Sequence, residues 1–244
     1  MQTIRAAANP ERGGDASSFK GQLPWASLAD ARTSTRRFMR DDVPDDVLAA
    51  MLVEARHAPS GANLQPGEFV RVDGAARETL SAALIRAHRS DVPAREDYSY
   101  FPAPMPMTLR RRQVAAAQAL YGALGAERED RASRQAQFER NFRFFDAPVA
   151  LLVTIDARMG SGCYMDLGMC LYGLMLAATS RGLGSWAIGA LASYPLVVRE
   201  VLDLPPGQSI VCGLAIGHAD RLGRVNTNLE ARQRRARSRG SRGT

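Results

Sequence analysis

The chain has 244 residues, of which 45% are hydrophobic, and it carries a formal net charge of +7. No run approaches the ~20 consecutive apolar residues that a membrane-spanning helix needs, and residues 1–14 lack the apolar stretch of a secretory signal. We therefore expect a globular protein of the cytoplasm that does not enter the membrane. Its three cysteines show no metal-ligand spacing, so no metal site is expected.

The excess positive charge is confined to the C-terminal end of the chain. Residues 221–244 contain eight arginines and one glutamate, a net charge of +7, so the remainder is balanced. No segment interleaves aromatic and basic residues in the manner of single-strand-binding proteins, so specific nucleic-acid binding is not expected. The composition predicts a flexible arm at 1–25, a single domain at 26–232 and a disordered arginine-rich tail at 233–244.

Helical and strand patterns are interspersed along the central domain. Apolar residues recur at helical spacing in 44–57, where Asp45 and Asp46 are expected to cap the helix, and they run continuously in the buried strand 148–155. The sequence therefore predicts an α+β fold with helices layered around one central sheet. The expected helices are 28–33, 44–57, 75–89, 108–125, 130–143, 163–180 and 195–202, and the expected strands are 68–72, 148–155, 185–188 and 209–216.

Two segments suggest features beyond this core. The stretch 90–107 is dense in Pro, Tyr and Phe, which excludes a regular element and indicates either the rim of a substrate pocket or a surface excursion. The helices that follow it, up to residue 145, are expected to pack outside the sheet. The helix 163–180 is apolar on nearly all sides, and a second subunit is the simplest way to enclose it.

Two polar motifs lie on either side of the helix 44–57. Arg32 and Arg36 are four residues apart with hydroxyl side chains between them, a pattern that suits a phosphate group. After the helix, Pro59 and Pro66 bracket a segment of small and amide residues that we expect to be extended. Its uncharged donors and acceptors suit the edge of a flat heteroaromatic ring. The alternative is an ordinary helix-to-strand connector.

These motifs resemble the FMN-dependent nitroreductase family. The resemblance rests on four segments in the same order: 32–38 (RTSTRRF), 58–66 (APSGANLQP), 181–189 (RGLGSWAIG), and 211–217 (VCGLAIG) followed by Arg232. Residues 120–125 and 140–149 are similar to the nitrobenzoate and dinitroaromatic reductase branch. The chain departs from the family at Gly189, where an acidic residue is common, and from the branch at Tyr194-Pro195, where Tyr-His is common.

The resemblance implies a three-layer α+β fold with a mostly antiparallel sheet, assembled as an intertwined homodimer. The flavin carries the chemistry in such proteins, so no catalytic side chain is expected. The backbone of Gly189 and Ala190 is expected near flavin N5 and O4, and Ser60 and Asn63 are expected to reach the ring from the other subunit. The full set implied for FMN is Arg32, Thr33, Ser34, Arg36, Pro59, Ser60, Gly61, Asn63, Gln65, Ile188, Gly189, Ala190 and Arg232, and the substrate pocket is expected to involve Tyr98, Phe101, Tyr121 and Phe142.

The implied reaction is a ping-pong cycle in which NADH or NADPH delivers hydride to flavin N5 and a nitroaromatic compound then takes the same site. A quinone is the alternative acceptor. Reductive dehalogenation on the same fold would need a Glu-Tyr-Lys lid, which we do not find, and Lys20 is the only lysine. An oxygen-dependent flavin enzyme of cobamide synthesis and a non-catalytic binder of flavin or polyanions are the remaining alternatives.

Overall fold

An antiparallel sheet of four strands forms the centre of the computed structural model, which describes residues 25–90, 92–125 and 130–227. The strand order is β1-β2-β4-β3, so β2 and β4 form the central pair. The predicted arm up to residue 24, Arg232 and the tail 233–244 lie outside the described residues. The strands are β1 (Glu68–Arg71), β2 (Val149–Asp156), β3 (Gly184–Ile188) and β4 (Gln208–Gly217).

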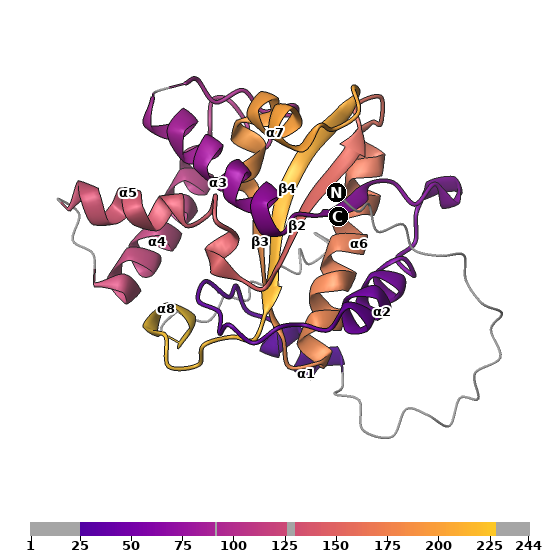
Figure 1. The fold of residues 1–244 in the computed structure, drawn as a ribbon, viewed down its shortest axis with the longest axis horizontal. Coiled ribbons are helices and arrows are strands. Elements are labelled where there is room, and N and C mark those ends of the chain that lie inside the picture. Colours follow the sequence, from indigo (N-terminus) through magenta and orange to yellow (C-terminus); the bar gives the residue numbers. More distant parts are fainter. Residues whose placement is uncertain (1–24, 91, 126–129, 228–244) are drawn as a thin grey trace, which may run out of the picture.

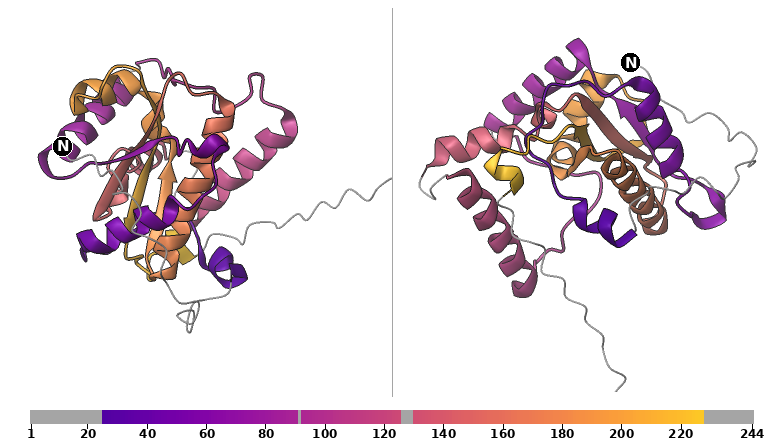
Figure 2. Two further views of the ribbon diagram at one scale, coloured as in Figure 1. Left: turned by 90° about the vertical axis from the view of Figure 1, so that its right-hand side faces the viewer. Right: turned by 90° about the horizontal axis from the view of Figure 1, so that it is seen from below.

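Helices cover both faces of this sheet (Figure 1, Figure 2). Helices α2 (Asp45–Ala55) and α6 (Ser161–Ser180) pack on one face, and α3 (Gly74–Arg89) and α7 (Pro195–Leu202) pack on the other. The side chains of β2 alternate between the two layers: Leu151 and Val153 join the first core cluster, and Leu152 joins the second. Because both faces are covered, β2 consists almost entirely of buried residues. The three-layer α+β arrangement and the antiparallel sheet are confirmed.

The segment that carries the predicted phosphate arginines lies along the free edge of β3. It follows α1 (Trp25–Ala31), and the Thr35 amide donates to the Ser185 carbonyl at 3.1 Å. The Met39 amide donates to the His218 carbonyl at 2.8 Å, just after β4. Gly184 permits this approach, because the Thr35 side chain occupies the position that a Cβ atom on Gly184 would need. The segment is therefore held to the sheet from both ends.

The predicted helical excursion lies outside the sheet. Helices α4 (Met107–Leu124) and α5 (Arg131–Glu139) extend to one side of the layered core (Figure 1). Within α4 only Ala123 is buried, and Met107 and Val114 are 66% and 47% exposed. Among the described residues, no helix has the length and hydropathy that crossing a bilayer requires.

Two details of the expected helices are wrong. The first residue before α2 is Pro44, and no side chain caps this helix; Asp45 and Asp46 lie in its first turn instead, where their charges favour the helix dipole. Helix α5 ends at Glu139 rather than at residue 143. Residues 140–143 form consecutive turns, in which the amides of Asn141, Phe142 and Arg143 donate to carbonyls three positions earlier. Phe144, Phe145 and Asp146 then adopt φ angles of +53°, +54° and +59°. A right-handed helix cannot continue through such residues.

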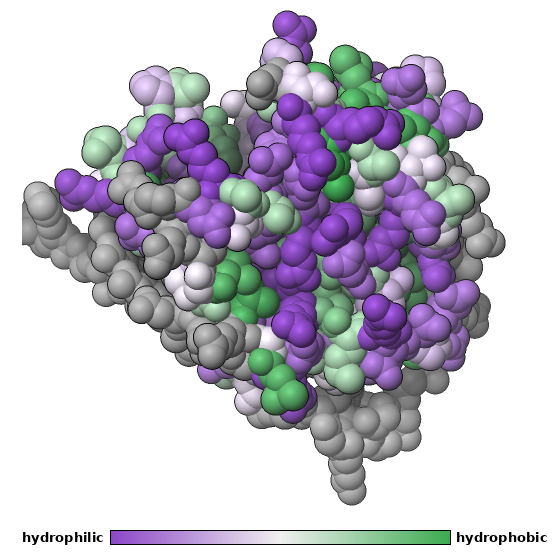
Figure 3. Space-filling model, turned by 60° about the vertical axis from the view of Figure 1, so that its left-hand side comes forward, coloured by the Kyte–Doolittle hydropathy of each residue, from purple (hydrophilic) through white to green (hydrophobic). Residues whose placement is uncertain are grey.

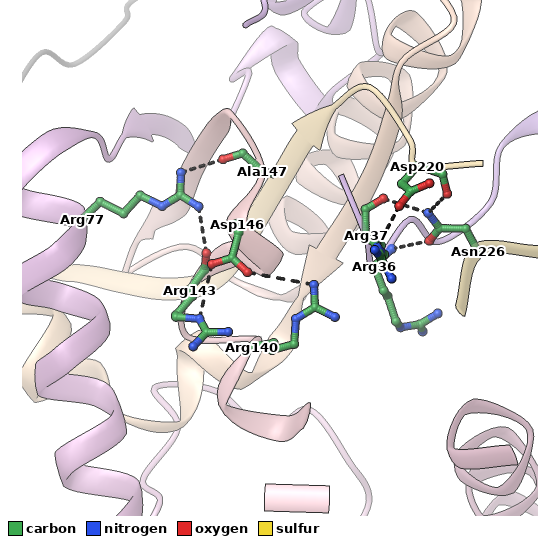
Figure 4. A network of polar contacts seen from close by, with 9 residues as sticks. All are labelled: Arg36, Arg37, Arg77, Arg140, Arg143, Asp146, Ala147, Asp220 and Asn226. Atoms are coloured by element: carbon green, nitrogen blue, oxygen red, sulfur yellow. Dashed lines mark hydrogen bonds and ion pairs between the residues drawn. The ribbon is translucent and has the colours of Figure 1, made fainter. Parts of the chain in front are cut away.

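The left-handed turn Phe144–Asp146 is held in place by arginine side chains (Figure 4). Both phenylalanines are buried, which keeps their rings in the core. Arg77, from α3, donates to the Arg143 carbonyl at 2.8 Å and to the Ala147 carbonyl at 2.6 Å, on either side of the turn. Left-handed residues cost about 1 kcal/mol or more each, so these bonds offset part of the strain.

Replacing Arg77 with Met should lower the free energy of unfolding by about 2–3 kcal/mol, because it removes two hydrogen bonds from a charged donor. Urea denaturation followed by circular dichroism measures this change. The control is Arg86→Met, an exposed arginine on the same helix, for which a change within about 0.5 kcal/mol is expected. Equal losses in the two variants would contradict the role of Arg77.

Candidate functional site

A half-buried arginine, Arg36, lies at the edge of the sheet where the segment 33–39 meets β3. The guanidinium carbon of Arg36 lies 3.9 Å from the centroid of the Trp186 ring. Burial lowers the pKa of Arg36 to about 10. In the described part of the chain, no acidic side chain forms an ion pair with Arg36. A desolvated cation in this situation is suited to an anionic ligand.

Asn226 fixes the backbone on which Arg36 sits (Figure 4). It belongs to the short helix α8 (Arg224–Thr227), and its side-chain oxygen accepts the Arg36 amide at 2.9 Å. Its side-chain nitrogen donates to the carbonyls of Arg37 at 2.7 Å and Asp220 at 2.9 Å. Sequence reasoning missed Asn226, because no local pattern links it to a segment 190 positions earlier.

The neighbouring predicted phosphate residues share this edge of the sheet. Ser34 forms an isolated parallel bridge with Ser185, and its carbonyl accepts from Arg36 Nη1 at 3.4 Å. Arg32 follows α1 and its side chain is only 6% exposed, whereas Thr33 is exposed. The indole nitrogen of Trp186 is buried and has no hydrogen-bond partner among the described residues. An orphaned donor beside a desolvated cation fits a site that holds a phosphorylated ligand.

The predicted ring-contacting turn lies at the end of β3. Ile188 is fully buried and ends the strand, and Gly189 begins a short 3-10 segment (Gly189–Ser193). Gly189 is exposed, and a Cβ atom placed on it would meet nothing within 4 Å. Ala190 is partly buried. The backbone at Gly189 is therefore accessible to a flat ligand.

The segment 58–66 is a tight turn, and the expectation of an extended backbone is wrong. Gly61–Asn63 form a 3-10 turn, and the φ angles of Ala62, Asn63 and Gln65 are +50°, +56° and +46°. The prolines restrict only their own and the preceding residues, so they leave the residues between them free to coil. Each left-handed residue costs about 1 kcal/mol or more. Residues 61–65 are nonetheless exposed, so the turn presents a strained backbone to its surroundings.

One chain does not bring the two halves of the predicted flavin set together. The turn at 58–66 follows α2 at the right of Figure 1, whereas α8 lies at the left, and the sheet and α6 lie between them. Arg36 is bonded to α8, and Gly61 is bonded to α6. Arg232 lies outside the described residues.

The Pro-rich loop is attached to the sheet edge beyond β3. Between Val153 and Thr154 the β2–β4 pairing shifts, which leaves Val211 as the extra residue of a bulge. The Tyr98 hydroxyl donates to the Val211 carbonyl at 2.8 Å, and Asp97 accepts the Ile210 amide at 2.9 Å. Burial raises the pKa of Tyr98, so its hydroxyl keeps its proton. These anchors hold the loop in a defined position.

The four aromatic residues predicted for the substrate pocket do not line one wall. Tyr98 packs against Tyr164, with ring centroids 5.2 Å apart, and Phe101 is 51% exposed in the same loop. Tyr121 lies on α4 beneath the guanidinium of Arg134. Phe142 is fully buried in the core, so its assignment to the pocket is wrong. Aromatic residues at helical spacing indicate one face of a helix, but the spacing does not distinguish a face that packs in the core from one that contacts a ligand.

Metal chemistry has no support in the part of the chain that the structure describes. No group of three His, Cys, Asp or Glu side chains could hold a metal ion there. The three cysteines are free, and burial raises the pKa of Cys212 to about 12, so this thiol stays protonated.

The fold and site together define an α+β protein with a half-buried arginine at the sheet edge and an exposed left-handed turn. A family model described as the nitroreductase family matches residues 29–218. The chain is 36% identical over 200 residues to the chloronitrobenzene nitroreductase of Comamonas testosteroni, covering 82% of this chain and 88% of that protein. It is 33% identical to the 4-nitrobenzoate reductase of Pseudomonas putida, covering 81% of this chain and 88% of that protein.

A solved structure shows the same fold. The FMN- and NADPH-dependent nitroreductase NfnB from Sphigopyxis sp. strain HMH superposes with a TM-score of 0.80 at 34% identity, covering 84% of this chain and 92% of that one. The chain therefore belongs to the nitroreductase family.

Replacing Asn226 with Ala should lower the free energy of unfolding by about 2 kcal/mol, since it leaves the Arg36 amide and two carbonyls without their partner. Urea denaturation measures the change. The control is Leu222→Ala, because Leu222 is 94% exposed in the same region. A variant as stable as the native protein would show that water replaces Asn226 without cost.

Proposed function

We propose that the protein is an FMN-dependent NAD(P)H nitroreductase that acts on nitroaromatic compounds in the cytoplasm. The observation that carries this proposal is Arg36, a desolvated cation that lacks a carboxylate partner among the described residues and lies in the segment 32–38, whose resemblance to the family implies a contact with the flavin phosphate. Two relatives are named as a chloronitrobenzene nitroreductase and a 4-nitrobenzoate reductase. The similar solved structure is named as an FMN- and NADPH-dependent nitroreductase. The free cysteines are consistent with a reducing compartment.

The residues of the sheet edge would hold FMN by its phosphate. Arg36 and Ser34 would contact the phosphate, and Arg32 and Thr33 lie next to them on the same segment. A phosphate dianion would offset the desolvation of Arg36, which is the condition under which a buried charge is tolerated. Arg232 is proposed as a further phosphate contact.

The ring of FMN would lie along the turn that follows β3. The exposed backbone of Gly189, with Ile188 and Ala190 beside it, would donate to the polar edge of the ring. Donors fixed at that edge favour negative charge on the ring during reduction. Bound FMN would supply the redox chemistry itself, taking two electrons from NAD(P)H and passing them to the nitro group. Tyr98, Phe101 and Tyr121 are proposed to border the substrate, and no protein side chain is needed as a nucleophile.

The second half of the site is proposed to come from a second copy of the chain. In one chain the turn 58–66, which follows α2, lies on the opposite side of the sheet and α6 from α8, to which Arg36 is hydrogen-bonded. Helix α6 exposes an apolar stripe at helical spacing: Met165 is 65% exposed, and Met169 and Tyr172 are each 37% exposed. By contrast, the side of the molecule around α3 and α5 is mostly hydrophilic (Figure 3). Exposed apolar stripes of this kind mark association surfaces, so α6 is the expected centre of a homodimer.

The first experiment is the visible spectrum of the purified protein, reconstituted with FMN and kept under anaerobic conditions. Flavin absorbance should bleach on addition of NADH or NADPH and return on addition of a dinitroaromatic compound. Bleaching that returns only with a quinone would replace the proposed substrate class. A protein that does not bind FMN would refute the proposal.

Replacing Arg36 with Met tests the phosphate role directly. Met retains apolar packing against Trp186 but removes the charge, so the dissociation constant for FMN should rise about 10- to 100-fold, the loss expected for charge-assisted hydrogen bonds. The cofactor-free protein should not lose stability, because a desolvated charge has been removed. Arg37→Met is the control, since Arg37 pairs with Asp220 at the surface and should leave FMN affinity unchanged.

A charge on the α6 stripe should separate the dimer. Met169→Glu would bury a carboxylate in the proposed interface, which costs several kcal/mol, so sedimentation should show a monomer that has lost FMN. The control is Leu196→Glu, because Leu196 is 69% exposed on α7, on the other side of the sheet. If Met169→Glu stays dimeric and keeps its flavin, α6 is not the interface.

A further inference from the structure

A buried carboxylate reaches from α6 to the strained turn at 58–66. Asp166 is 7% exposed, and its Oδ2 atom accepts the Gly61 amide at 2.9 Å. The residues next to it in the core are apolar: Leu167 is 1% exposed and Cys170 is 5% exposed. A carboxylate buried in such surroundings is costly unless its bonds compensate. The hydrogen bond to Gly61 is therefore the specific compensation that the structure provides.

The other end of the turn is held by a guanidinium group. Arg56 donates to the carbonyls of Gln65 at 3.1 Å, Pro66 at 3.3 Å and Gly67 at 2.7 Å. Within the turn, the Ser60 hydroxyl accepts the Gln65 amide at 2.9 Å. Arg56 and Asp166 also border the same small hollow. Two charged side chains, Arg56 just after α2 and Asp166 on α6, thus hold the turn at its two ends.

The hydrogen bonds to Asp166 and Arg56 are needed because the residues of the turn do not favour its conformation by themselves. Ala62 and Gln65 have side chains that disfavour their positive φ angles, whereas Asn63 tolerates the same conformation more readily. Residues 61–65 are exposed, so core packing does not keep them in place. A strained backbone conformation persists only where surrounding interactions hold it in place. Such strain is concentrated at functional sites. Asp166 and Arg56 supply that constraint from the two ends.

We propose that Asp166 and Arg56 are positioning residues that hold Ser60 and Asn63 in the conformation that contacts the flavin ring. This inference rests on the proposed function. Asp166 lies between Met165 and Met169 on the helix that forms the proposed dimer surface, so the same helix turn places the flavin loop relative to the second copy. The two residues act on the flavin through the loop and do not contact it themselves.

The test compares Asp166→Ala, Asp166→Asn and a control, Glu54→Gln. Glu54 forms a comparable pair of bonds with Arg181 but lies on the exposed side of α2. Two quantities are measured: the hydrogen-exchange rate of the Gly61 amide in the cofactor-free protein, and the dissociation constants for FMN and riboflavin. The melting temperature of each variant shows whether it is folded.

In Asp166→Ala we expect faster exchange at Gly61 and about tenfold weaker binding of both flavins, the loss that one charged hydrogen bond supports. The ratio of FMN to riboflavin affinity should not change, because the loop is proposed to act on the ring rather than the phosphate. In Arg36→Met the preference for FMN over riboflavin should be largely lost, because only FMN carries the phosphate. Asp166→Asn keeps an acceptor oxygen and should restore most of the protection and affinity, and Arg56→Lys should lose affinity as Asp166→Ala does.

Unchanged exchange at Gly61, or unchanged affinity for both flavins in Asp166→Ala, would overturn the proposal. A variant that fails to fold leaves Asp166→Asn and Arg56→Lys to decide the same question. If the native protein itself does not bind FMN, the proposed function fails and the flavin role of Asp166 fails with it. Exchange at Gly61 then still decides whether Asp166 holds the turn.

Discussion

The close approach of the segment 33–39 to β3 is the contact on which the site depends. It is possible because Gly184 has no side chain, which leaves room for Thr35. The approach allows the Ser34–Ser185 bridge and the Thr35 hydrogen bond, and it places the Arg36 guanidinium on the Trp186 ring. Asn226 then locks the same backbone from the C-terminal side. A charge that would otherwise be solvated is thereby held in a desolvated position, which supports the proposed role of Arg36 as an anion site.

The polar residues of the proposed site lie in two separate places in one chain. In the proposed dimer, α6 would bring these two places together. The sheet edge holds the half-buried Arg36, and the turn after α2 holds the uncharged donors and acceptors. Helix α6 bonds to that turn through Asp166 and exposes methionines on the adjacent surface. A dimer built on α6 would therefore complete the site and bury the apolar stripe with the same set of contacts. We propose this coupling as the reason why the largely apolar α6 contains the buried carboxylate of Asp166.

Apart from the single residue Asp203 after α7, the left-handed non-glycine residues of the described chain fall into two groups. The two groups have different meanings. The turn Phe144–Asp146 directs two phenylalanine rings into the core, and Arg77 binds the carbonyls beside it. That strain is balanced by burial and serves the fold. The turn containing Ala62, Asn63 and Gln65 is also left-handed, but its residues are exposed. Burial of side chains therefore does not stabilise this conformation. Strain that packing does not explain is the stronger indication of a functional role.

The sequence by itself determined the order and type of the main elements, the α+β class and the family. These follow from apolar periodicity and from short motifs, which are local properties of the chain. Tertiary structure alone decided that Phe142 faces the core, that α5 stops at Glu139, and that the segment 58–66 coils instead of extending. Asp166 and Asn226 were also beyond local inference, because they act on residues 105 and 190 positions away. Which face of a stripe is buried, and which distant side chain completes a turn, depends on contacts that form only when the chain has folded.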